Sequence, residues 1–455
     1  MRRQKNKITN ILVIMFLLLI TAAVVFVYFS PKFEKNAPKV ELQSNGYWNL
    51  KDKLRVKLND ESGIKFYRVY YKNGATNELV KSAQINSKLQ DLVFDIDGIS
   101  LPKGVEKIQL TIEVVDNSSW NFFNGNKTVK SFDLVIDRTR PIANVIRNSY
   151  NIRRGGSAAV VVEVKDKNLQ DFYISFNDKY RFELIPYLKD GYYVAIIAWP
   201  VGVEDFERVN LIAIDKAKNT TISKVPLYIK DLKIKNDKIN ISENFINKVS
   251  VPVLQQSNLN IPSNNAEIFI KQNRELREAN VNKIREVSLE KMSKQKVNNF
   301  NIKAFKRLRN SKTFAGFAER REYFYDDQKI DEAWHLGMDW ASIKHATITI
   351  SNGGEVIFSD YLGIYGNTLI VDHGWGLQTL YAHTSRFLTN VGEKINRGDK
   401  IAHTGSTGAV FGDHLHFGVL VQGIEVNPVE WMDRNWIKTR ITDILSDAKK
   451  VINSK

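Results

Sequence analysis

An apolar run near the N-terminus restricts where this part of the chain can fold. Residues Ile11–Phe29 carry no charge and are interrupted only by Thr21. The run matches the roughly 20 residues that a helix needs to cross a bilayer. A cleaved signal peptide has a shorter apolar core of about 7–15 residues, and Pro31 stands where a spanning helix would stop. We therefore predict that residues 1–30 form a short tail and a transmembrane anchor.

The charges before this run predict its orientation. Four basic residues precede it and no acidic ones do: Arg2, Arg3, Lys5 and Lys7. Basic flanks remain in the cytoplasm. We therefore predict a single-pass protein of the cytoplasmic (inner) membrane, whose remaining residues lie on the periplasmic or extracytoplasmic side.

Net charge and cysteine content limit the partners and the sites. The formal net charge is +16, and the Lys and Arg residues are dispersed. In an exported chain this suits anionic envelope polymers or membrane surfaces, with general solubility as the alternative. No nucleic-acid-binding motif occurs, so we expect no nucleic-acid partner. The chain has no cysteine, which excludes disulfides and leaves His, Asp and Glu as metal ligands.

Residues 38–231 read as many short strands separated by turns, as in Leu54–Leu58 and Tyr192–Ile197. This pattern is typical of β-sandwiches. A weak repeat relates Asp60 to Asp166 and Asp116 to Asp215, with offsets of 106 and 99 residues. We predict two tandem immunoglobulin-like sandwiches, residues 38–137 and 138–231. They are candidate spacers or binding surfaces for cell-wall or division proteins.

The second half is predicted to begin with a connector. Residues 232–305 are interpreted as a polar linker followed by a helix over about 265–292, which starts at the capping-box pair Asn264 and Glu267. Strand and glycine-turn patterns return from residue 306 to 432. An amphipathic helix is expected over 433–455. The predicted fold class is therefore mainly β.

All seven histidines lie between residues 335 and 416. Histidines with general surface or core roles would be scattered, so this confinement indicates one site that needs imidazoles, most commonly for a metal. The histidines are His335, His345, His373, His383, His403, His414 and His416.

Spacing within this window suggests how the imidazoles are used. His414 and His416 are two apart in a strand-like segment, so both side chains point to one face. His335 and Asp339 are four apart around Gly337, which favours a turn or irregular strand. Two histidines and one aspartate would leave a coordination position open, as catalytic zinc requires. No His-Glu-x-x-His helix occurs, so His383 and the non-ligating member of His414 and His416 are the candidates for proton transfer.

The C-terminal region resembles the lysostaphin-like, LytM-type zinc endopeptidases of bacterial cell walls, peptidase family M23. The resemblance covers about residues 310–430. The matching stretches are His335-Leu336-Gly337-Met338-Asp339-Trp340-Ala341, Tyr365-Gly366-Asn367, Val371-Asp372-His373-Gly374, Leu380-Tyr381-Ala382-His383, Val391-Gly392-Glu393-Lys394-Ile395, Gly405-Ser406-Thr407-Gly408 and His414-Leu415-His416-Phe417.

This resemblance implies a small antiparallel β-sheet with a groove over the metal. It implies that His335, Asp339 and His416 bind Zn²⁺, and that His383 and His414 serve as base and transition-state stabiliser, in an order left open. The implied substrates are peptidoglycan peptides. We predict a D,D-endopeptidase that cuts cross-links during wall remodelling and acts on cell shape or division.

Several alternatives accompany this hypothesis. Some family members have lost ligands and activate other wall hydrolases, so a non-hydrolytic scaffold is the main rival, and an adhesion protein led by the sandwiches is a remoter one. The linker or the 265–292 helix is a candidate for covering the groove. His373 is expected to be structural, and His345 and His403 ordinary residues. Arg321, Tyr323 and Asn367 are candidate substrate contacts for which a structural role is as well supported.

Overall fold

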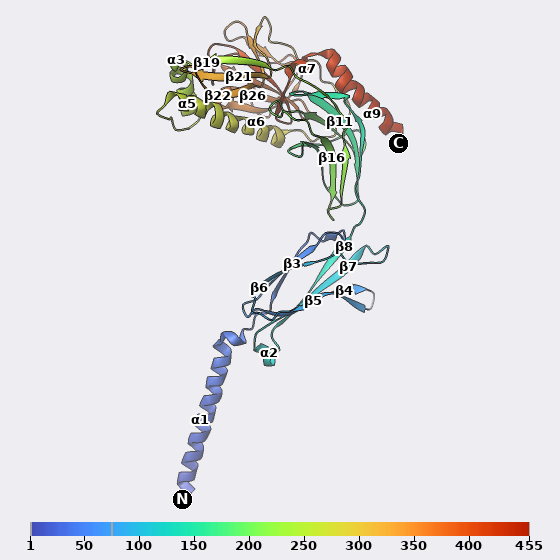
Figure 1. Cartoon of the computed structure of the whole chain (residues 1–455), viewed down its shortest axis with the longest axis vertical. Helices are drawn as coiled ribbons and strands as arrows, with labels where there is room; N and C mark the ends of the chain where they lie inside the picture. Colours follow the sequence, from blue (N-terminus) through green and yellow to red (C-terminus); the bar gives the residue numbers. More distant parts are fainter. Residues whose placement is uncertain (1, 74–75, 455) are drawn as a thin grey trace. The chain divides into compact units, whose positions relative to one another are not determined.

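The computed structural model describes residues 2–73 and 76–454, and for residues 2–7 and 73 the backbone alone. The described chain is mainly β-strand, which confirms the predicted class, and its longer helices lie at the N-terminus, before the C-terminal sheet and at the C-terminus (Figure 1). The chain divides into two compact units, residues 1–140 with 214–219, and residues 141–213 with 220–455.

The first unit begins with helix α1 (Arg2–Phe29), which contains the predicted anchor. Its Ile8–Phe29 part is long and apolar enough to cross a membrane. Leu18 and Phe26 are 64% and 60% exposed, as expected of side chains that would face lipid rather than protein. The helix ends at Phe29, and Pro31 starts the short 3₁₀ helix η1 (Pro31–Phe33).

Two sheets, in which most neighbouring strands are antiparallel, follow α1 in the first unit and enclose an apolar core. Buried and exposed residues alternate along β3, so Leu54, Val56 and Leu58 face inward and pack with Trp48 and Leu110. Alternation of this kind places one face of each strand in the core between the two sheets. One sheet has the order β1 (Lys39–Gln43), β3 (Leu54–Asn59), β6 (Asp91–Ile96), and the other β2 (Tyr47–Trp48), β8 (Lys127–Ile136), β7 (Lys107–Asp116), β4 (Ile64–Asn73), β5 (Thr76–Gln84).

The region of the second predicted sandwich contains two four-stranded sheets. One has the order β14 (Ile185–Pro186), β15 (Tyr192–Ala198), β11 (Ser157–Lys165), β9 (Ile142–Asn148), and the other β13 (Tyr180–Glu183), β12 (Leu169–Phe176), β16 (Val209–Asp215), β17 (Thr220–Lys224). Strands β10 (Asn151–Arg153) and β18 (Tyr228–Lys230) form a separate parallel pair.

The predicted boundary at residue 231 does not separate this sandwich from the C-terminal region, because the two share one hydrophobic core. Every residue of β11 from Ser157 to Val164 is buried, so the strand is covered on both faces. Trp431 Nε1 donates to Ser157 Oγ at 3.1 Å, and the Tyr187 hydroxyl to Leu445 O at 3.1 Å. A strand buried on both faces has a near-continuous apolar sequence, as β11 does from Ala158 to Val162.

An antiparallel sheet forms the centre of the C-terminal region, as predicted. Its strands alternate between two apolar layers, with Leu369 and Val371 on one face and Ile370 on the other. The order is β20 (Lys312–Ala315), β23 (Met338–Ala341), β31 (Leu415–Val421), β27 (Leu377–Ala382), β26 (Asn367–Asp372), β25 (Gly354–Tyr361), β29 (Lys394–Ile395), with β32 (Ile424–Val426) beside β31. A smaller sheet has the order β24 (Thr347–Thr349), β30 (Lys400–His403), β28 (Arg386–Phe387).

Helices cover the Ile370 face of this sheet. The helix predicted over 265–292 consists of α5 (Asn265–Lys271), the π-helical turn η3 (Gln272–Leu276) and α6 (Arg277–Lys291). Asn264 caps it by accepting hydrogen bonds from the backbone of Ala266 and Glu267. Ile268, Phe269, Ile284 and Val287 pack into the layer that also contains Ile370, Leu380 and Leu420.

Part of the predicted linker is instead built into the fold. Strand β19 (Lys235–Asn240) pairs in parallel with β21 (Glu319–Tyr325), which pairs with β22 (Gln328–His335). It leads into α3 (Glu243–Phe245), η2 (Ile246–Ser250) and α4 (Val251–Gln256). The linker prediction was wrong here because a few spaced apolar residues, Ile239, Ile241 and Ile246, suffice to attach this Asn- and Lys-rich segment to the neighbouring core.

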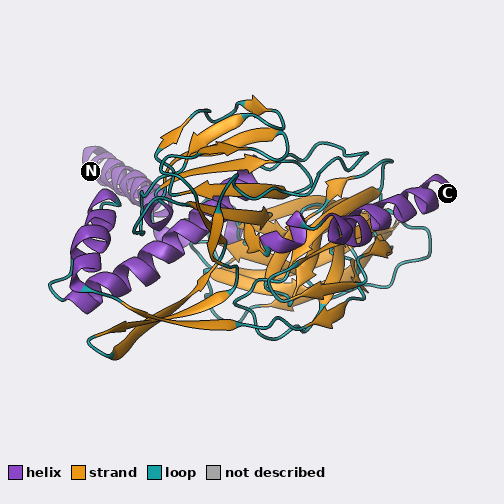
Figure 2. Ribbon diagram, turned by 90° about the horizontal axis from the view of Figure 1, so that it is seen from above, coloured by secondary structure: helices purple, strands orange, loops and turns teal. Residues whose placement is uncertain are grey.

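The chain ends in α7 (Pro428–Met432), α8 (Arg434–Ile437), the π-helical turn η5 (Lys438–Thr442) and α9 (Asp443–Ser454), in agreement with the amphipathic helix predicted there (Figure 2). Ile441, Leu445, Ala448 and Ile452 are buried on one side, and α9 contacts β9 and β11. The C-terminal helix therefore completes the core that the second pair of sheets shares with the central sheet.

Candidate metal and catalytic site

Strand register brings the central site residues together. Asp339 on β23 is directly opposite His416 on β31, and His416 is in turn opposite Ala382, the last residue of β27. Directly paired residues of antiparallel strands have their side chains on the same face. His383 follows Ala382, and His414 precedes β31 by one residue. Residues far apart in sequence thus meet at one end of three adjacent strands.

His335, Asp339 and His416 form a cluster that could hold a metal ion. His335 Nε2 is 3.0 Å from Asp339 Oδ2, His416 Nδ1 is 2.9 Å from Asp339 Oδ1, and the two ring nitrogens are 3.2 Å apart. Ligands about 2.0–2.1 Å from a tetrahedral zinc ion are about 3.3 Å from one another. The donor chemistry and the spacing therefore fit zinc.

Neighbouring backbone fixes how His335 and His416 are placed. The His335 Nδ1–H donates to the carbonyl of Gly316 at 2.7 Å, which directs Nε2 toward Asp339. Gly337 lies directly against the ring of His416, and a Cβ there would also be 2.8 Å from the carbonyl oxygen of Phe417. The glycine in the His-Leu-Gly-Met-Asp stretch is thus required by close packing at the cluster.

Asp339 is ionised by its surroundings. Burial alone would raise its pKa, but the adjacent imidazoles of His335 and His416 hold the pKa of this carboxyl well below its usual value. Arg321 Nη2 lies 3.6 Å from Asp339 Oδ2 and 3.7 Å from Glu319 Oε2. Arg321, a candidate substrate contact in the sequence, therefore touches a candidate metal ligand.

His383 and His414 stand side by side next to this cluster, with ring centroids 5.0 Å apart. Each donates its Nδ1–H to a carbonyl, His383 to Thr407 at 2.9 Å and His414 to Gly412 at 3.0 Å. Since a carbonyl only accepts, Nδ1 of each ring is the donor, and Nε2 is the atom that can exchange a proton with a substrate. His414 Nε2 is 3.8 Å from Asp339 Oδ1.

The two rings differ in their exposure, because His383 is buried and His414 is half-buried. His383 is 6% exposed, and burial, followed by the nearby His414 and His416, lowers its pKa well below the ordinary value. The ring is therefore neutral near pH 7. Its backbone is left-handed, with φ of 61°, and its N–H donates to Tyr365 O at 2.8 Å. A strained backbone held in this way is common where a side chain must be aimed.

The other histidines do not join the cluster. His373 is buried, with Nδ1 2.8 Å from Gly353 O and Nε2 2.8 Å from Thr379 Oγ1, and burial lowers its pKa to about 4. This agrees with the structural role expected. His403 Nδ1 lies 3.1 Å from His345 O, and His345 Nδ1 lies 3.0 Å from Ser385 Oγ. Asn367 donates its backbone N–H to Thr407 Oγ1 at 2.9 Å.

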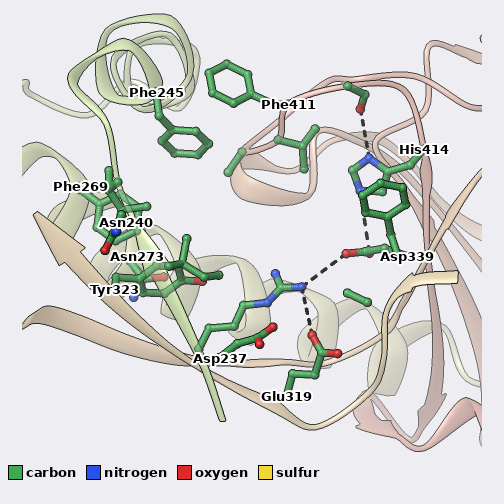
Figure 3. Close-up of a pocket in the computed structure, with 18 of the residues that line it drawn as sticks. Asp237, Asn240, Phe245, Phe269, Asn273, Glu319, Tyr323, Asp339, Phe411 and His414 are labelled. Carbon is green, nitrogen blue, oxygen red and sulfur yellow. Dashed lines mark hydrogen bonds and ion pairs between the residues drawn. The ribbon is translucent and has the colours of Figure 1, made fainter. Parts of the chain in front are cut away.

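A groove of about 810 Å³ leads to the cluster (Figure 3). Asp339 and His414 lie at one end, Phe269 and Tyr323 at the other, and Phe245 and Phe411 above. The rings of Phe245 and Phe411 meet edge to face, with centroids 5.0 Å apart. One wall comes from β21, β23 and the loop before His414.

The rest of the lining comes from the segment predicted to be a linker and helical connector, including β19, which pairs with β21. Its residues include Asp237, Asn240, Phe245, Asn273 and Arg277. The sequence makes this segment a candidate for covering the groove, but none of these individual residues was assigned to the site. The signal available was weak: two aromatic residues, Phe245 and Phe269, within a polar stretch.

A protein-family model for Peptidase family M23 matches residues 333–428. The C-terminal region is an M23 peptidase domain. The match contains His335, Asp339, His383, His414 and His416, the same residues that the fold brings together.

This M23 domain has curated relatives. The chain is 38% identical over 95 residues to the DD-carboxypeptidase/endopeptidase Mpg of Neisseria meningitidis. The aligned stretch covers 21% of this chain and 22% of Mpg. The chain is 33% identical over 110 residues to the murein hydrolase activator EnvC of Escherichia coli, covering 24% and 26%. The chain spans about a quarter of the length of these relatives. A solved zinc-containing peptidase from Vibrio cholerae aligns with 72% of this chain and 81% of its own, at 12% identity and a TM-score of 0.28.

Proposed function

We propose that this chain is a zinc-dependent endopeptidase that hydrolyses amide bonds in the cross-link peptides of peptidoglycan, with D,D-bonds as its target. The carrying observation is the cluster of His335, Asp339 and His416 with the imidazoles of His383 and His414 beside it, each held through Nδ1, at the end of a groove. The activity named for the relative Mpg, DD-carboxypeptidase/endopeptidase, supports the choice of bond.

His335, Asp339 and His416 would hold the zinc ion. When bound, the ion polarises the scissile carbonyl and lowers the pKa of the attacking water. The Nε2 atom of His383 or His414 accepts the proton of that water, and the protonated ring returns it to the leaving amide nitrogen. The second ring is assigned to stabilising the developing oxyanion. Because both rings are fixed through Nδ1, no reorientation is needed during these steps.

The groove suits an extended peptide. The groove runs from the cluster to the apolar side chains of Phe245, Phe269 and Phe411. It is also lined by the charged residues Arg277, Arg321 and Asp237. Peptidoglycan stem peptides combine small apolar side chains with amine and carboxylate groups, so this lining has partners for each. Helix α1 would anchor the enzyme, with the M23 domain on the extracytoplasmic side.

A second candidate function is a non-hydrolytic activator that recruits or activates another wall hydrolase, and the match to EnvC is the observation in its favour. The two differ in one respect that can be measured. An activator needs the groove and its surface but not proton transfer, whereas an endopeptidase needs His414. Protein partners of the sandwich modules belong to either hypothesis.

The test is digestion of purified peptidoglycan by the full chain in detergent, with released muropeptides identified by mass. We expect conversion of cross-linked dimers to monomers, abolished by a chelator and restored by Zn²⁺. His414→Ala should keep bound zinc, measured by elemental analysis, and lose product. His403→Ala, a histidine outside the cluster, is the matched control.

Product formation by His414→Ala at the rate of the unaltered chain would refute the proposed mechanism. Absence of product from the unaltered zinc-loaded chain, together with stimulation of a wall amidase in the same assay, would replace the endopeptidase by the activator.

A further inference from the structure

The first sandwich carries an exposed aromatic loop beside the end of α1. The loop follows β7 and contains α2 (Trp120–Phe123). Phe122 is 93% exposed and Phe123 72% exposed. Single exposed apolar residues are ordinary on protein surfaces, but two adjacent phenylalanines next to a membrane-spanning candidate require an explanation.

The backbone holds these side chains outward. Asn121, Phe122 and Phe123 have φ of 53°, 54° and 67°, all in the left-handed region. Residues other than glycine, asparagine and aspartate adopt that region rarely, and successive ones very rarely. A conformation of this kind, which turns two large apolar side chains toward solvent, is more readily understood if they have an apolar environment to enter.

The loop is tied to the segment that leaves α1. Ser119 donates its backbone N–H to Lys32 O at 2.7 Å, and Ser118 Oγ donates to Glu34 O at 2.6 Å. The ring of Phe123 meets that of Phe33, with centroids 6.2 Å apart. Phe33 in turn meets Phe26, within the last turns of α1, at 6.3 Å.

Chain length then limits how far the loop can be from the bilayer. Phe33 is four residues beyond the end of α1 at Phe29. Even a fully extended chain covers at most about 3.3–3.6 Å per residue, so Phe33 lies within about 14 Å of that helix end. The headgroup layer on each side of a bilayer is roughly 5–7 Å thick. The loop therefore sits at or near the membrane surface whatever the tilt of α1.

An internal comparison shows that the aromatic segment is an insertion. In the first sandwich Asn126 Nδ2 donates to Asp116 Oδ2 at 2.8 Å, across a separation of ten residues. At the equivalent corner Asn219 Nδ2 donates to Asp215 Oδ2 at 2.8 Å, across four. The same hydrogen bonds close both turns, so the fold does not need the additional residues. They occur in the repeat that follows α1.

Nearby polar groups have the composition of a membrane interface. Lys35 Nζ lies 3.7 Å from the ring centre of Tyr28 and 4.9 Å from that of Trp120. Tyrosine and tryptophan are enriched at the headgroup level, and lysine side chains extend toward lipid phosphates there. The group of residues Tyr28, Phe29, Lys35, Trp120, Phe122 and Phe123 is called the aromatic collar below.

We propose that the aromatic collar docks the first sandwich onto the phospholipid bilayer, with Phe122 and Phe123 inserted at the boundary of headgroups and acyl chains, as a second membrane contact beside α1. This goes beyond the endopeptidase proposal and does not depend on catalysis, although it rests on α1 spanning the membrane. The contact limits rotation of the sandwich about its tether.

The test uses the absence of cysteine from the chain. Single substitutions Phe122→Cys, Leu79→Cys and Leu18→Cys are labelled with an environment-sensitive fluorophore in the full chain, reconstituted in phosphatidylethanolamine and phosphatidylglycerol nanodiscs. Leu79 is 61% exposed and is the matched control, because it pairs with Tyr70 toward the opposite end of β4 from the loop. Leu18 reports insertion of α1.

We expect lipid-borne nitroxides near the headgroup to quench the Phe122 probe, mid-chain nitroxides to quench the Leu18 probe, and only an aqueous quencher to affect Leu79. Aqueous quenching of the Phe122 probe equal to that of Leu79, while Leu18 is quenched by lipid, would overturn the collar proposal. Loss of lipid quenching at Leu18 would overturn the anchor and the collar together. Digestion of peptidoglycan by the same proteins reports separately on the endopeptidase.

Discussion

Glu430 makes the stability of the second unit depend on pH. It lies on α7, is 9% exposed and accepts a hydrogen bond from the Ser157 backbone N–H at 3.0 Å. Burial raises its pKa from 4.5 to about 7, against smaller opposing effects of that hydrogen bond, Arg153 and Arg440. The perturbation is Glu430→Gln, which keeps the shape and an acceptor oxygen but removes the titration.

The sign and size follow from proton linkage. The folded pKa is above the unfolded one, so the protonated carboxyl stabilises the fold fully below pH 4.5, and this contribution is lost as pH rises through about 7. Each pKa unit corresponds to about 1.4 kcal/mol, so the difference amounts to about 3 kcal/mol at pH 8. We expect the Gln variant to come within about 1 kcal/mol of the unaltered chain at pH 5 and to be more stable at pH 8 by up to about 3 kcal/mol.

The assay is urea unfolding of the full chain in detergent at pH 5 and pH 8, followed by tryptophan fluorescence. Trp431 and Trp436, whose ring centroids are 5.3 Å apart, adjoin Glu430 and report on this unit. Glu278→Gln removes a charge from an exposed helical position and is the control. Equal dependence of stability on pH in the Glu430 variant and the unaltered chain would refute the reasoning.

Three further outcomes are expected. Gly337→Ala should lower zinc affinity at least about tenfold, the effect usual for a disturbed ligand environment, by pushing the His416 ring; zinc binding measured by competition with a chromogenic chelator checks this, and unchanged affinity would contradict it. Phe245→Ala should raise KM for a cross-linked muropeptide with little change in kcat; a rise in kcat would show instead that α3 covers the groove. Leu420→Ala, at a fully buried position, should lower the free energy of unfolding by about 2–5 kcal/mol, and a smaller loss in urea unfolding would mean that the helix layer collapses onto the sheet.

The sequence predicted elements well where one local signal sufficed. The apolar run of α1, the cap at Asn264 and the two-residue spacing of His414 and His416 each depend on nearby residues and agree with the structure. Local patterns do not predict that Asp339 lies opposite His416, because the strand register that pairs them is a long-range property. Only the family resemblance implied this pairing.

Long-range packing explains what sequence reasoning could not reach. Whether β11 is covered on its second face depends on α9 and Trp431, almost 300 residues away, and β19 is a strand because β21 offers it a free edge. Neither partner is visible in the local pattern. The groove wall around Phe245 was missed for the same reason.

The shared core under β11 has a consequence for how such enzymes are exchanged between proteins. Suppose that recombination moved residues 306–432 alone into another chain. The sheet in the new chain would then lack the cover that β11 and β15 provide, and in the original chain Val160, Ile196 and their neighbours would face water. The unit that can be inherited or transplanted intact therefore starts near residue 141, and the sandwich travels with the peptidase as part of one folding unit.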